Sequence, residues 1–259
     1  MMRISSSVRY GALALAGLLV SGCGQWSQAQ SVTETTVEVQ APVTTTTIVE
    51  TGISAVGQRS GLSTKAVQQK LIDLGFWLAS VDGTYDNTTR QAVMAFQKFY
   101  QLHPTGTTNE ATAWLLENLT LRPQATPTTK SLAEFDKKRQ LLFLVRDGET
   151  VFILNASAGD DREYTEPDGN SPGVMITGKA VTPVGEFKVD RERADGWWVG
   201  DLGQIYRPKY FKGGIAIHGS YSVPAYPSSH GCVRVSVAAM DMIWDLDLLR
   251  RGTTVWVLE

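Results

Sequence analysis

The apolar residues of this chain change their spacing once, and that change limits the folds open to it. Between about residues 60 and 120 they recur every three or four positions, as in Val67, Leu71 and Leu74, which is typical of helices. From about Ser131 they alternate with polar residues, as in the stretch RQLLFLVRDGETVFILNAS, which is typical of strands. We therefore predict a small helical part followed by a mainly-β part, and an α+β fold overall.

The helical part is expected to hold three short helices. The first ends near Gly75, because glycine commonly follows the last turn of a helix. Thr88 and Gln91 are spaced as a capping box for the second helix. The apolar stripes that predict the second and third helices are Ala92, Val93, Phe96 and Phe99, then Ala111, Trp114 and Leu115.

A similar turn precedes the second and the third predicted helix. The stretches are DGTYDNTTRQAV from Asp82 and TGTTNEATAWLL from Thr105, which share Gly in second place and Thr in eighth. Asp86 and Asn109 are residues that tolerate a left-handed backbone at these turns. The pattern resembles the three-helix type of peptidoglycan-binding domain, which we expect over residues 59–120. The alternative is a helical spacer that binds nothing.

The mainly-β part starts with a predicted hairpin. Asp147 and Gly148 separate its two alternating runs, and Asp-Gly is a strong signal for a two-residue turn. Further strands are expected near residues 186–189, 215–218, 232–235 and 254–258, with one helix in SVAAMDMIWDLDLL before the last. This second domain is placed at residues 131–259, after a linker over 121–130.

The N-terminal residues read as an export signal. Two arginines precede a short apolar run, and the stretch Val20-Ser21-Gly22-Cys23 resembles the bacterial lipobox, in which the cysteine carries a lipid. We expect a signal peptide over 1–22, lipidation of Cys23 and a Thr-rich tether over 23–58. An ordinary signal peptide with a chance cysteine is the alternative.

Charge and cysteine content exclude two classes of protein. A formal net charge of −2 over 259 residues argues against a nucleic-acid binder. Only two cysteines are present, so the chain is not a scaffold held by disulfides. If Cys23 carries lipid, Cys232 has no disulfide partner, and an unpaired thiol in an exported protein is a candidate reactive group. A buried, inert cysteine is the alternative.

Three of the five Cys and His residues lie close together in the sequence, in GGIAIHGSY and SSHGCVRVS. His218 can accept the thiol proton of Cys232, which makes the sulfur a nucleophile. Backbone N–H groups of His230, Gly231 and Cys232 lie on a turn where Gly231 permits unusual dihedral angles, and they can face a developing oxyanion. Zinc is the weaker alternative, because no further histidine is near enough to complete a ligand set. No metal is expected.

Three motifs resemble one enzyme family. The pair IHG and SHGCVRVS resembles the catalytic signature of the L,D-transpeptidase (YkuD-type) family, TPVGEF at Thr182–Phe187 resembles its upstream turn, and RQLLFLVRDGE resembles its opening hairpin. The similarity covers residues 131–259. The spacer between His218 and Ser229 is ten residues, shorter than in many members, and Arg234 stands where many members have Asn.

This resemblance implies a role for each motif residue. Cys232 is the nucleophile, His218 the proton acceptor and donor, and the Gly219 carbonyl orients the imidazole. The amides of His230, Gly231 and Cys232 hold the oxyanion. The remaining expectations concern substrate: Tyr210 over the acyl group or merely packed, Ser229 bracing the turn, and Arg234 facing a substrate carboxylate or tying down the cysteine loop.

The implied reaction joins the third residues of two peptidoglycan stem peptides through a thioester. A tetrapeptide stem is the donor, an amine of a neighbouring stem is the acceptor, and no cofactor is required. Glycan strands and, through lipid on Cys23, a membrane are the other expected partners, at the outer face of the cytoplasmic membrane. A carbapenem is expected to acylate Cys232. An L,D-carboxypeptidase and a non-catalytic wall-binding lipoprotein are the alternatives.

Overall fold

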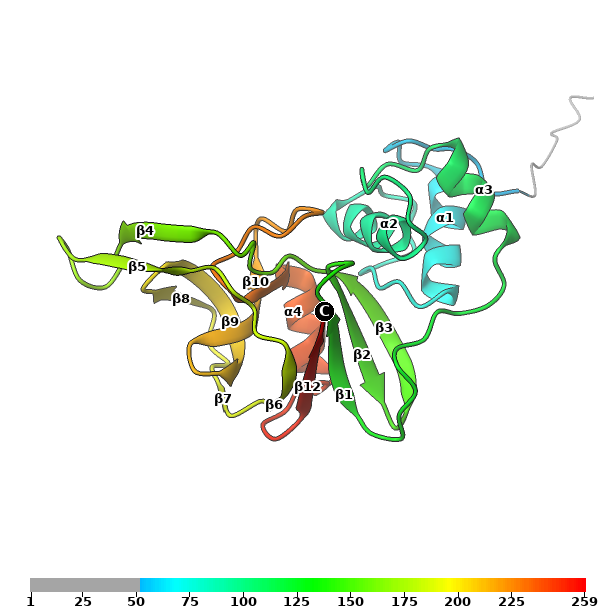
Figure 1. Cartoon of the computed structure of the whole chain (residues 1–259). Helices are drawn as coiled ribbons and strands as arrows, with labels where there is room; N and C mark the ends of the chain where they lie inside the picture. Colours follow the sequence, from blue (N-terminus) through cyan, green and yellow to red (C-terminus); the bar gives the residue numbers. More distant parts are fainter. Residues whose placement is uncertain (1–51) are drawn as a thin grey trace, which may run out of the picture. The chain divides into compact units, whose positions relative to one another are not determined.

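The computed structural model describes residues 52–259, and Figure 1 shows three helices followed by strands. The helices are α1 (Leu62–Asp73), α2 (Asn87–Phe99) and α3 (Glu110–Asn118), which confirms the predicted three-helix part and the α+β fold. Gly75 adopts a φ of +89° just after α1, as expected of a residue that ends a helix. None of the helices in this range is long and apolar enough to cross a membrane. Cys23, the predicted signal peptide and residues 23–51 of the predicted tether lie outside the described residues. The last part of the predicted tether is described, and it packs on the helical part: Val56 is buried, and Gly57 exchanges backbone hydrogen bonds with Thr108.

The repeated turns cap α2 and α3 differently from the prediction. Asp86 and Asn109 are the N-caps, and their side chains accept from the N–H of Thr89 and Thr112. Both have an extended backbone, with φ of −89° and −83°, so the predicted left-handed conformation is wrong. The predicted capping box is also wrong, because Thr88 already lies in the first turn of α2.

A buried glutamine stands behind each of these turns. Gln68 of α1 accepts from the Gly83 N–H at 2.7 Å and donates to the Thr84 carbonyl and the Thr89 hydroxyl. Gln97 of α2 makes the same set of bonds to the next turn, to Gly106 N–H, the Thr107 carbonyl and the Thr112 hydroxyl. Each helix therefore holds the turn that starts the next one.

The predicted core face of α3 is wrong. Trp114 is 65% exposed and Ala111 is also exposed, whereas Thr112, Ala113 and Leu116 are buried. The prediction chose Ala111, Trp114 and Leu115 because they are apolar. The helix instead buries two small residues, Thr112 and Ala113, and Leu116. The buried Thr112 is accommodated because its hydroxyl is hydrogen-bonded.

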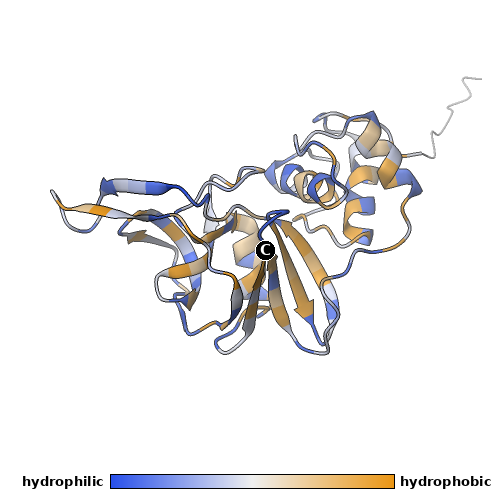
Figure 2. Ribbon diagram, in the orientation of Figure 1, coloured by the Kyte–Doolittle hydropathy of each residue, from blue (hydrophilic) through white to orange (hydrophobic). Residues whose placement is uncertain are grey.

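A first sheet of five strands has the order β3-β2-β1-β12-β6. Its antiparallel β2–β3 hairpin turns at Asp147 and Gly148, which have φ of 52° and 87°, and this confirms the predicted hairpin. In Figure 2 the ribbons of β2 and β3 are mainly apolar, as expected of strands buried on both faces. The strands are β1 (Leu132–Asp136), β2 (Leu141–Arg146), β3 (Glu149–Asn155), β6 (Gly185–Lys188) and β12 (Thr254–Leu258).

A second sheet carries the motif residues. It has the order β11-β10-β9-β7, and β8 pairs with the N-terminal part of β9. Helix α4 (Val237–Asp245) packs on β9, β10 and β11. Strands β4 and β5 form a separate hairpin. The bounds are β4 (Glu163–Pro167), β5 (Met175–Lys179), β7 (Arg191–Glu192), β8 (Trp197–Gly200), β9 (Gly203–Lys212), β10 (Ile215–Ser220) and β11 (Val233–Ser236).

The main core fills the space between the two sheets and α4. A second core cluster joins the helical part to the first sheet, because Leu141, Phe143 and Ile153 pack with apolar residues of α1 and α2. The segment predicted as a linker, 121–130, is also attached to the sheet, since the Ala125 N–H donates to the Thr150 hydroxyl at 2.8 Å. The described residues, 52–259, accordingly belong to one compact unit.

Candidate active site

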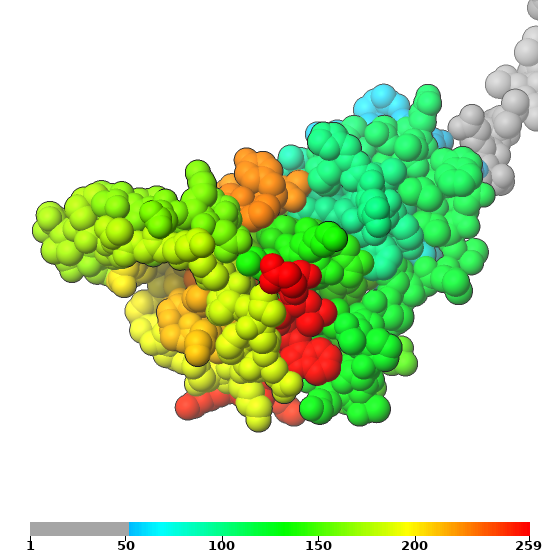
Figure 3. Space-filling model, viewed as in Figure 1, coloured from blue at the N-terminus to red at the C-terminus, as the bar shows by residue number. Residues whose placement is uncertain are grey.

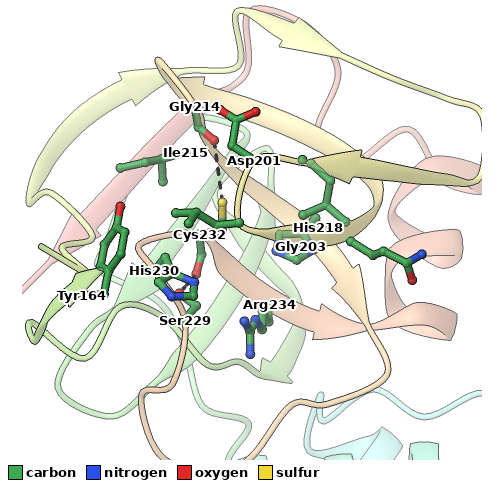
Figure 4. A pocket seen from close by; sticks show the side chains of 14 residues that line it. Tyr164, Asp201, Gly203, Gly214, Ile215, His218, Ser229, His230, Cys232 and Arg234 are labelled. Carbon is green, nitrogen blue, oxygen red and sulfur yellow. Dashed lines mark hydrogen bonds between the residues drawn. The ribbon is translucent and has the colours of Figure 1, made fainter. Parts of the chain in front are cut away.

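His218 and Cys232 line one pocket of about 270 Å³. His218 lies on β10 and Cys232 immediately precedes β11, and these two strands are parallel neighbours with His218 opposite Arg234. Figure 4 shows the Cys232 sulfur between Tyr164 and His230 on one side and His218 on the other. The chain therefore brings together the two residues that the sequence singled out as base and nucleophile.

The imidazole of His218 is held from one side by its own strand. Its Nδ1 lies 2.9 Å from the Gly219 carbonyl oxygen, the contact that the family resemblance implied. A carbonyl only accepts, so Nδ1 carries the proton and Nε2 keeps a free lone pair. Burial is the main cause that lowers the pKa of His218 to about 4; the hydrogen bond to Gly219 acts in the opposite direction, and the positive charge of Arg234 adds to the lowering. The ring is consequently neutral at pH 7 and able to accept a proton.

The thiol of Cys232 is free and half-buried. Its sulfur accepts from the Ala216 N–H at 3.4 Å and donates to the Gly214 carbonyl at 3.7 Å. Burial raises the pKa of Cys232, while the Ala216 N–H and the charge of Arg234 act in the opposite direction. Because the pKa of the thiol is raised and that of the imidazole is lowered, the resting pair is neutral rather than a thiolate and an imidazolium.

The turn before Cys232 is fastened by Ser229. Its hydroxyl accepts from the Gly231 N–H at 3.0 Å and donates to the Cys232 carbonyl. Gly231 has a φ of +131°, and a Cβ at this position would lie 2.7 Å from the Val181 carbonyl oxygen, so only glycine fits. The Gly231 N–H is already engaged, in contrast to the expectation that it faces an oxyanion. The N–H groups of His230 and Cys232 remain as candidates.

Thr182 connects the upstream motif to the cysteine turn. Its buried hydroxyl accepts from the Gly159 N–H at 3.0 Å and donates to the Gly231 carbonyl at 2.7 Å. The sequence identified TPVGEF as a turn but gave no indication that its threonine contacts the catalytic motif. The contact depends on bringing together segments about 50 positions apart, which no local pattern encodes.

The side chain of His230 contacts the β4–β5 hairpin. Its Nε2 lies 3.0 Å from Glu166 Oε1, and its ring meets the Tyr164 ring edge-on at 4.7 Å between centroids. Tyr164 also lines the pocket. Sequence reasoning missed this hairpin, because β4 and β5 are largely exposed and have no apolar alternation.

Tyr210 does not take the place expected of it. It is 8% exposed on β9, with the Arg191 guanidinium 3.9 Å from its ring centre, and it is not among the residues that line the pocket. The aromatic ring at the pocket belongs to Tyr164 instead. Arg234 does line the pocket, and its backbone pairs with Ser157 while its guanidinium lies 3.5 Å from the Ser228 hydroxyl.

The zinc alternative finds no support in the geometry. Within residues 52–259, no three His, Cys, Asp or Glu side chains are grouped so that they could hold a metal ion. His218 bonds to its neighbouring carbonyl and His230 bonds to Glu166, so the two rings serve different partners. The pocket instead brings together a free thiol, a neutral imidazole and the cysteine turn, the kinds of group that acyl transfer uses.

Comparisons with known proteins point to the same chemistry. Residues 130–257 match the L,D-transpeptidase catalytic domain (YkuD), and residues 60–116 match a putative peptidoglycan binding domain. The crystal structure of the L,D-transpeptidase from Xylanimonas cellulosilytica DSM 15894 is 40% identical, with a TM-score of 0.70 over 80% of this chain and 98% of that one.

A second solved structure, the L,D-transpeptidase (Yku) from Stackebrandtia nassauensis, is 19% identical with a TM-score of 0.43, over 80% of this chain and 96% of that one. None of the curated proteins matches the chain. The match at 40% identity spans both the helical part and the β part of this chain. The chain belongs to the L,D-transpeptidase family, with a YkuD catalytic domain preceded by a peptidoglycan-binding domain of the three-helix type.

Proposed function

We propose that this protein cross-links peptidoglycan stem peptides through a thioester on Cys232. The thiol attacks the carbonyl carbon of the third, diamino-acid residue of a tetrapeptide stem. As the S–C bond forms, Nε2 of His218 takes the thiol proton. The C–N bond to the terminal D-alanine then breaks, and the imidazolium returns the proton to the departing amine. An amine of a second stem attacks the thioester and restores the thiol.

The observation that carries this proposal is the pairing of a free thiol with a neutral, oriented imidazole in one pocket. A neutral base is needed at the moment of attack, and the low pKa of His218 keeps it available at pH 7. The N–H groups of His230 and Cys232 are the proposed oxyanion donors. The thioester retains the energy of the broken amide bond, so the reaction needs no nucleotide.

The remaining proposals concern place and partners. Peptidoglycan lies outside the cytoplasm, and the three-helix domain is proposed to hold glycan strands near the cysteine, which raises the local concentration of stems. Lipidation of Cys23 would attach the chain to the outer face of the cytoplasmic membrane. Arg234 at the pocket is proposed to meet a substrate carboxylate, which a guanidinium binds through two parallel hydrogen bonds.

Two other functions start from the same site. If water resolves the thioester, the product is a tripeptide and the enzyme is an L,D-carboxypeptidase. If the site is inert, the chain only binds the wall. The thiol, the imidazole and the fastened turn are all in place, which favours an enzyme over an inert binder.

One experiment separates these functions. The purified full chain is incubated with a synthetic tetrapeptide stem, and the products are identified by mass spectrometry. We expect a dimer linked between third residues, and we expect the Cys232→Ala variant to form none. A free tripeptide instead of a dimer would identify a carboxypeptidase. An unchanged tetrapeptide would contradict both enzymatic functions.

A further inference from the structure

Helix α2 places two buried polar side chains against the β part of the molecule. Gln91 and Lys98 are two helical turns apart on one face of α2, and each is 8% exposed. The hydrogen bonds of both side chains run to the catalytic domain rather than to α1 or α3. In Figure 3 the segment that follows β10, coloured orange, lies against the surface of the helical domain.

Gln91 holds the loop that joins the base to the nucleophile. This loop, residues 221–232, starts after β10, which carries His218, and ends at Cys232. The Gln91 amide donates to the Val223 carbonyl at 3.2 Å. Its oxygen accepts from Asn155 Nδ2, which also donates to the Val223 carbonyl at 3.2 Å. One side chain of α2 and one of β3 thus hold the same backbone group of the loop.

Lys98 holds the segment on which the other end of the loop rests. Its ammonium donates to the carbonyls of Gln140 and Ala156 at 3.1 and 3.0 Å. The next two residues after Ala156 bind the cysteine turn directly. Ser157 exchanges backbone hydrogen bonds with Arg234, and the Ala158 carbonyl accepts from the N–H groups of Ser228 and Ser229. Lys98 therefore holds Ala156, and the two residues that follow Ala156 support the cysteine turn.

These contacts fix the loop because breaking them is costly. Without α2 in its place, the carbonyls of Val223, Gln140 and Ala156 would lose hydrogen bonds, and a buried polar group that loses its partner is unfavourable. Loop 221–232 contains no helix or strand, so its conformation depends on contacts of this kind. A displacement of about 1 Å between reacting groups can slow a reaction by about a hundredfold.

We propose that the helical domain, besides any role in binding the wall polymer, positions the loop between His218 and Cys232, with Gln91 as the positioning residue. The inference rests on the proposed function only in taking Cys232 as the reactive group. A domain that merely tethered polymer would influence the supply of stems and not the reactivity of the thiol. The two roles therefore differ in their effect on a small reagent that does not bind glycan.

The test compares two identical substitutions on α2 in the full chain. Gln91→Met keeps the length of the side chain and removes its hydrogen bonds to Asn155 and Val223. Gln97→Met makes the same chemical change within the helical domain, where the bonds of Gln97 stay. For each variant, intact-protein mass spectrometry gives the maximal rate of carbapenem acylation of Cys232 and the drug concentration at half that rate. Retention on purified sacculi and iodoacetamide alkylation of Cys232 are measured as well.

We expect Gln91→Met to lower the maximal acylation rate by about tenfold to a hundredfold. The half-saturating concentration and the retention on sacculi should stay unchanged, and Gln97→Met should keep the wild-type rate below its unfolding temperature. A wild-type rate in Gln91→Met overturns the proposal, and so does an equal loss in Gln97→Met, which would indicate general destabilisation.

The test also covers two other outcomes, a variant that does not fold and a wild type that takes no drug. If Gln91→Met does not fold, Gln91→Ala takes its place, because it removes the same hydrogen bonds to Asn155 and Val223 with a smaller side chain and no added charge. If the wild type takes no drug, the proposed function is contradicted, and the alkylation rates then decide this inference alone. Equal alkylation of Cys232 in the wild type and in the Gln91 variant would overturn it.

Discussion

At the scale of single residues, burial keeps the thiol and the imidazole of the active site uncharged. The pKa of His218 is lowered to about 4 and that of Cys232 is raised, in both cases mainly by removal from water. A buried ion pair would require desolvation of two charges, which is costly. Under the proposed function, the thiol would therefore lose its proton to His218 only as it attacks a substrate carbonyl.

This electrostatic arrangement sets the pH dependence of acylation. His218 is a neutral base above about pH 4, because its folded pKa is depressed below 6.5. We expect the rate of carbapenem acylation to be maintained from pH 7 to pH 5 and to fall as the pH passes through about 4. Mass spectrometry of the adduct at each pH measures the rate, and circular dichroism confirms that the chain is still folded. An inflection near pH 6.5 would contradict this assignment.

The sequence predicted the site residues that lie in its short motifs, and it missed those that reach the site from distant segments. His218 and Cys232 lie in the two stretches of one signature, IHG and SHGCVRVS, and their place at one pocket could be predicted from it. Thr182 and Tyr164 reach the site from distant segments, Thr182 through its hydroxyl and Tyr164 from an exposed hairpin. Tyr210 was expected over the acyl group from the family resemblance, but on β9 its ring packs against the Arg191 guanidinium and does not line the pocket.

At the scale of elements, the two repeated turns of the helical domain depend on a glutamine in the preceding helix. Gln68 and Gln97 are both fully buried, and each bonds to a glycine N–H, a carbonyl and the hydroxyl of a threonine in the first turn of the next helix. The bonds link consecutive elements in a series from α1 to α3. Part of the order in this small domain thus comes from polar groups rather than from its apolar core alone.

Replacement of Gln68 by Met should destabilise the fold markedly. The variant keeps the volume of the side chain but leaves the buried Gly83 N–H and Thr89 hydroxyl with fewer partners, at a cost of about 2–4 kcal/mol in the free energy of unfolding. Urea denaturation followed by circular dichroism measures the change. Gln69→Met is the matched control, because Gln69 is exposed and bonds only to Asp73 among the described residues. Equal losses in both variants would rule out the buried network as the cause.

Elements with a clear apolar period were predicted well, and those without one were missed. The β2–β3 hairpin, β6, β10, β11 and β12 and helix α4 all lie where the alternation placed them. Strands β4 and β5 are exposed, and the pairing of β9 with β10 shifts register near Arg207, which has a φ of 46°. For α3 the helix was found, but its buried face was not, because Trp114 faces outward.

At the scale of the whole molecule, the helical domain and the catalytic domain are joined through the edge of the first sheet. Ile153 of β3 exchanges backbone hydrogen bonds with the segment after α1, donating to the Gly75 carbonyl and accepting from the Trp77 N–H. Phe99 of α2 meets Phe143 of β2 edge-on at 6.2 Å. The helical domain thereby covers an edge strand that would otherwise be open to pairing with another chain.

Lys98, buried where α2 meets the catalytic domain, should give stability a measurable pH dependence. Burial lowers its pKa from 10.5 to about 7. Between pH 7 and 10.5 the unfolded chain holds a proton that the folded chain has released, so the free energy of unfolding rises with pH. The contribution approaches about 1.4 kcal/mol per pH unit.

The Lys98→Met variant isolates this contribution. Urea denaturation at pH 7, 8 and 9 should show a smaller rise of the unfolding free energy with pH in the variant than in the wild type. All other titrating groups are shared, so the difference between the two slopes reports Lys98 alone. Parallel slopes would mean that Lys98 titrates normally in the folded chain.

The position of β12 has a consequence for the order in which the protein can fold. This strand, residues 254–258, lies between β1 and β6 and pairs with both, although it follows the cysteine turn in the sequence. During synthesis the cysteine turn is made before β12, so β6 has no neighbour in its sheet until residues 254–258 have left the ribosome. The newly made chain thus carries Cys232 before its first sheet is complete, and β12 is the strand that attaches β6 to the other three.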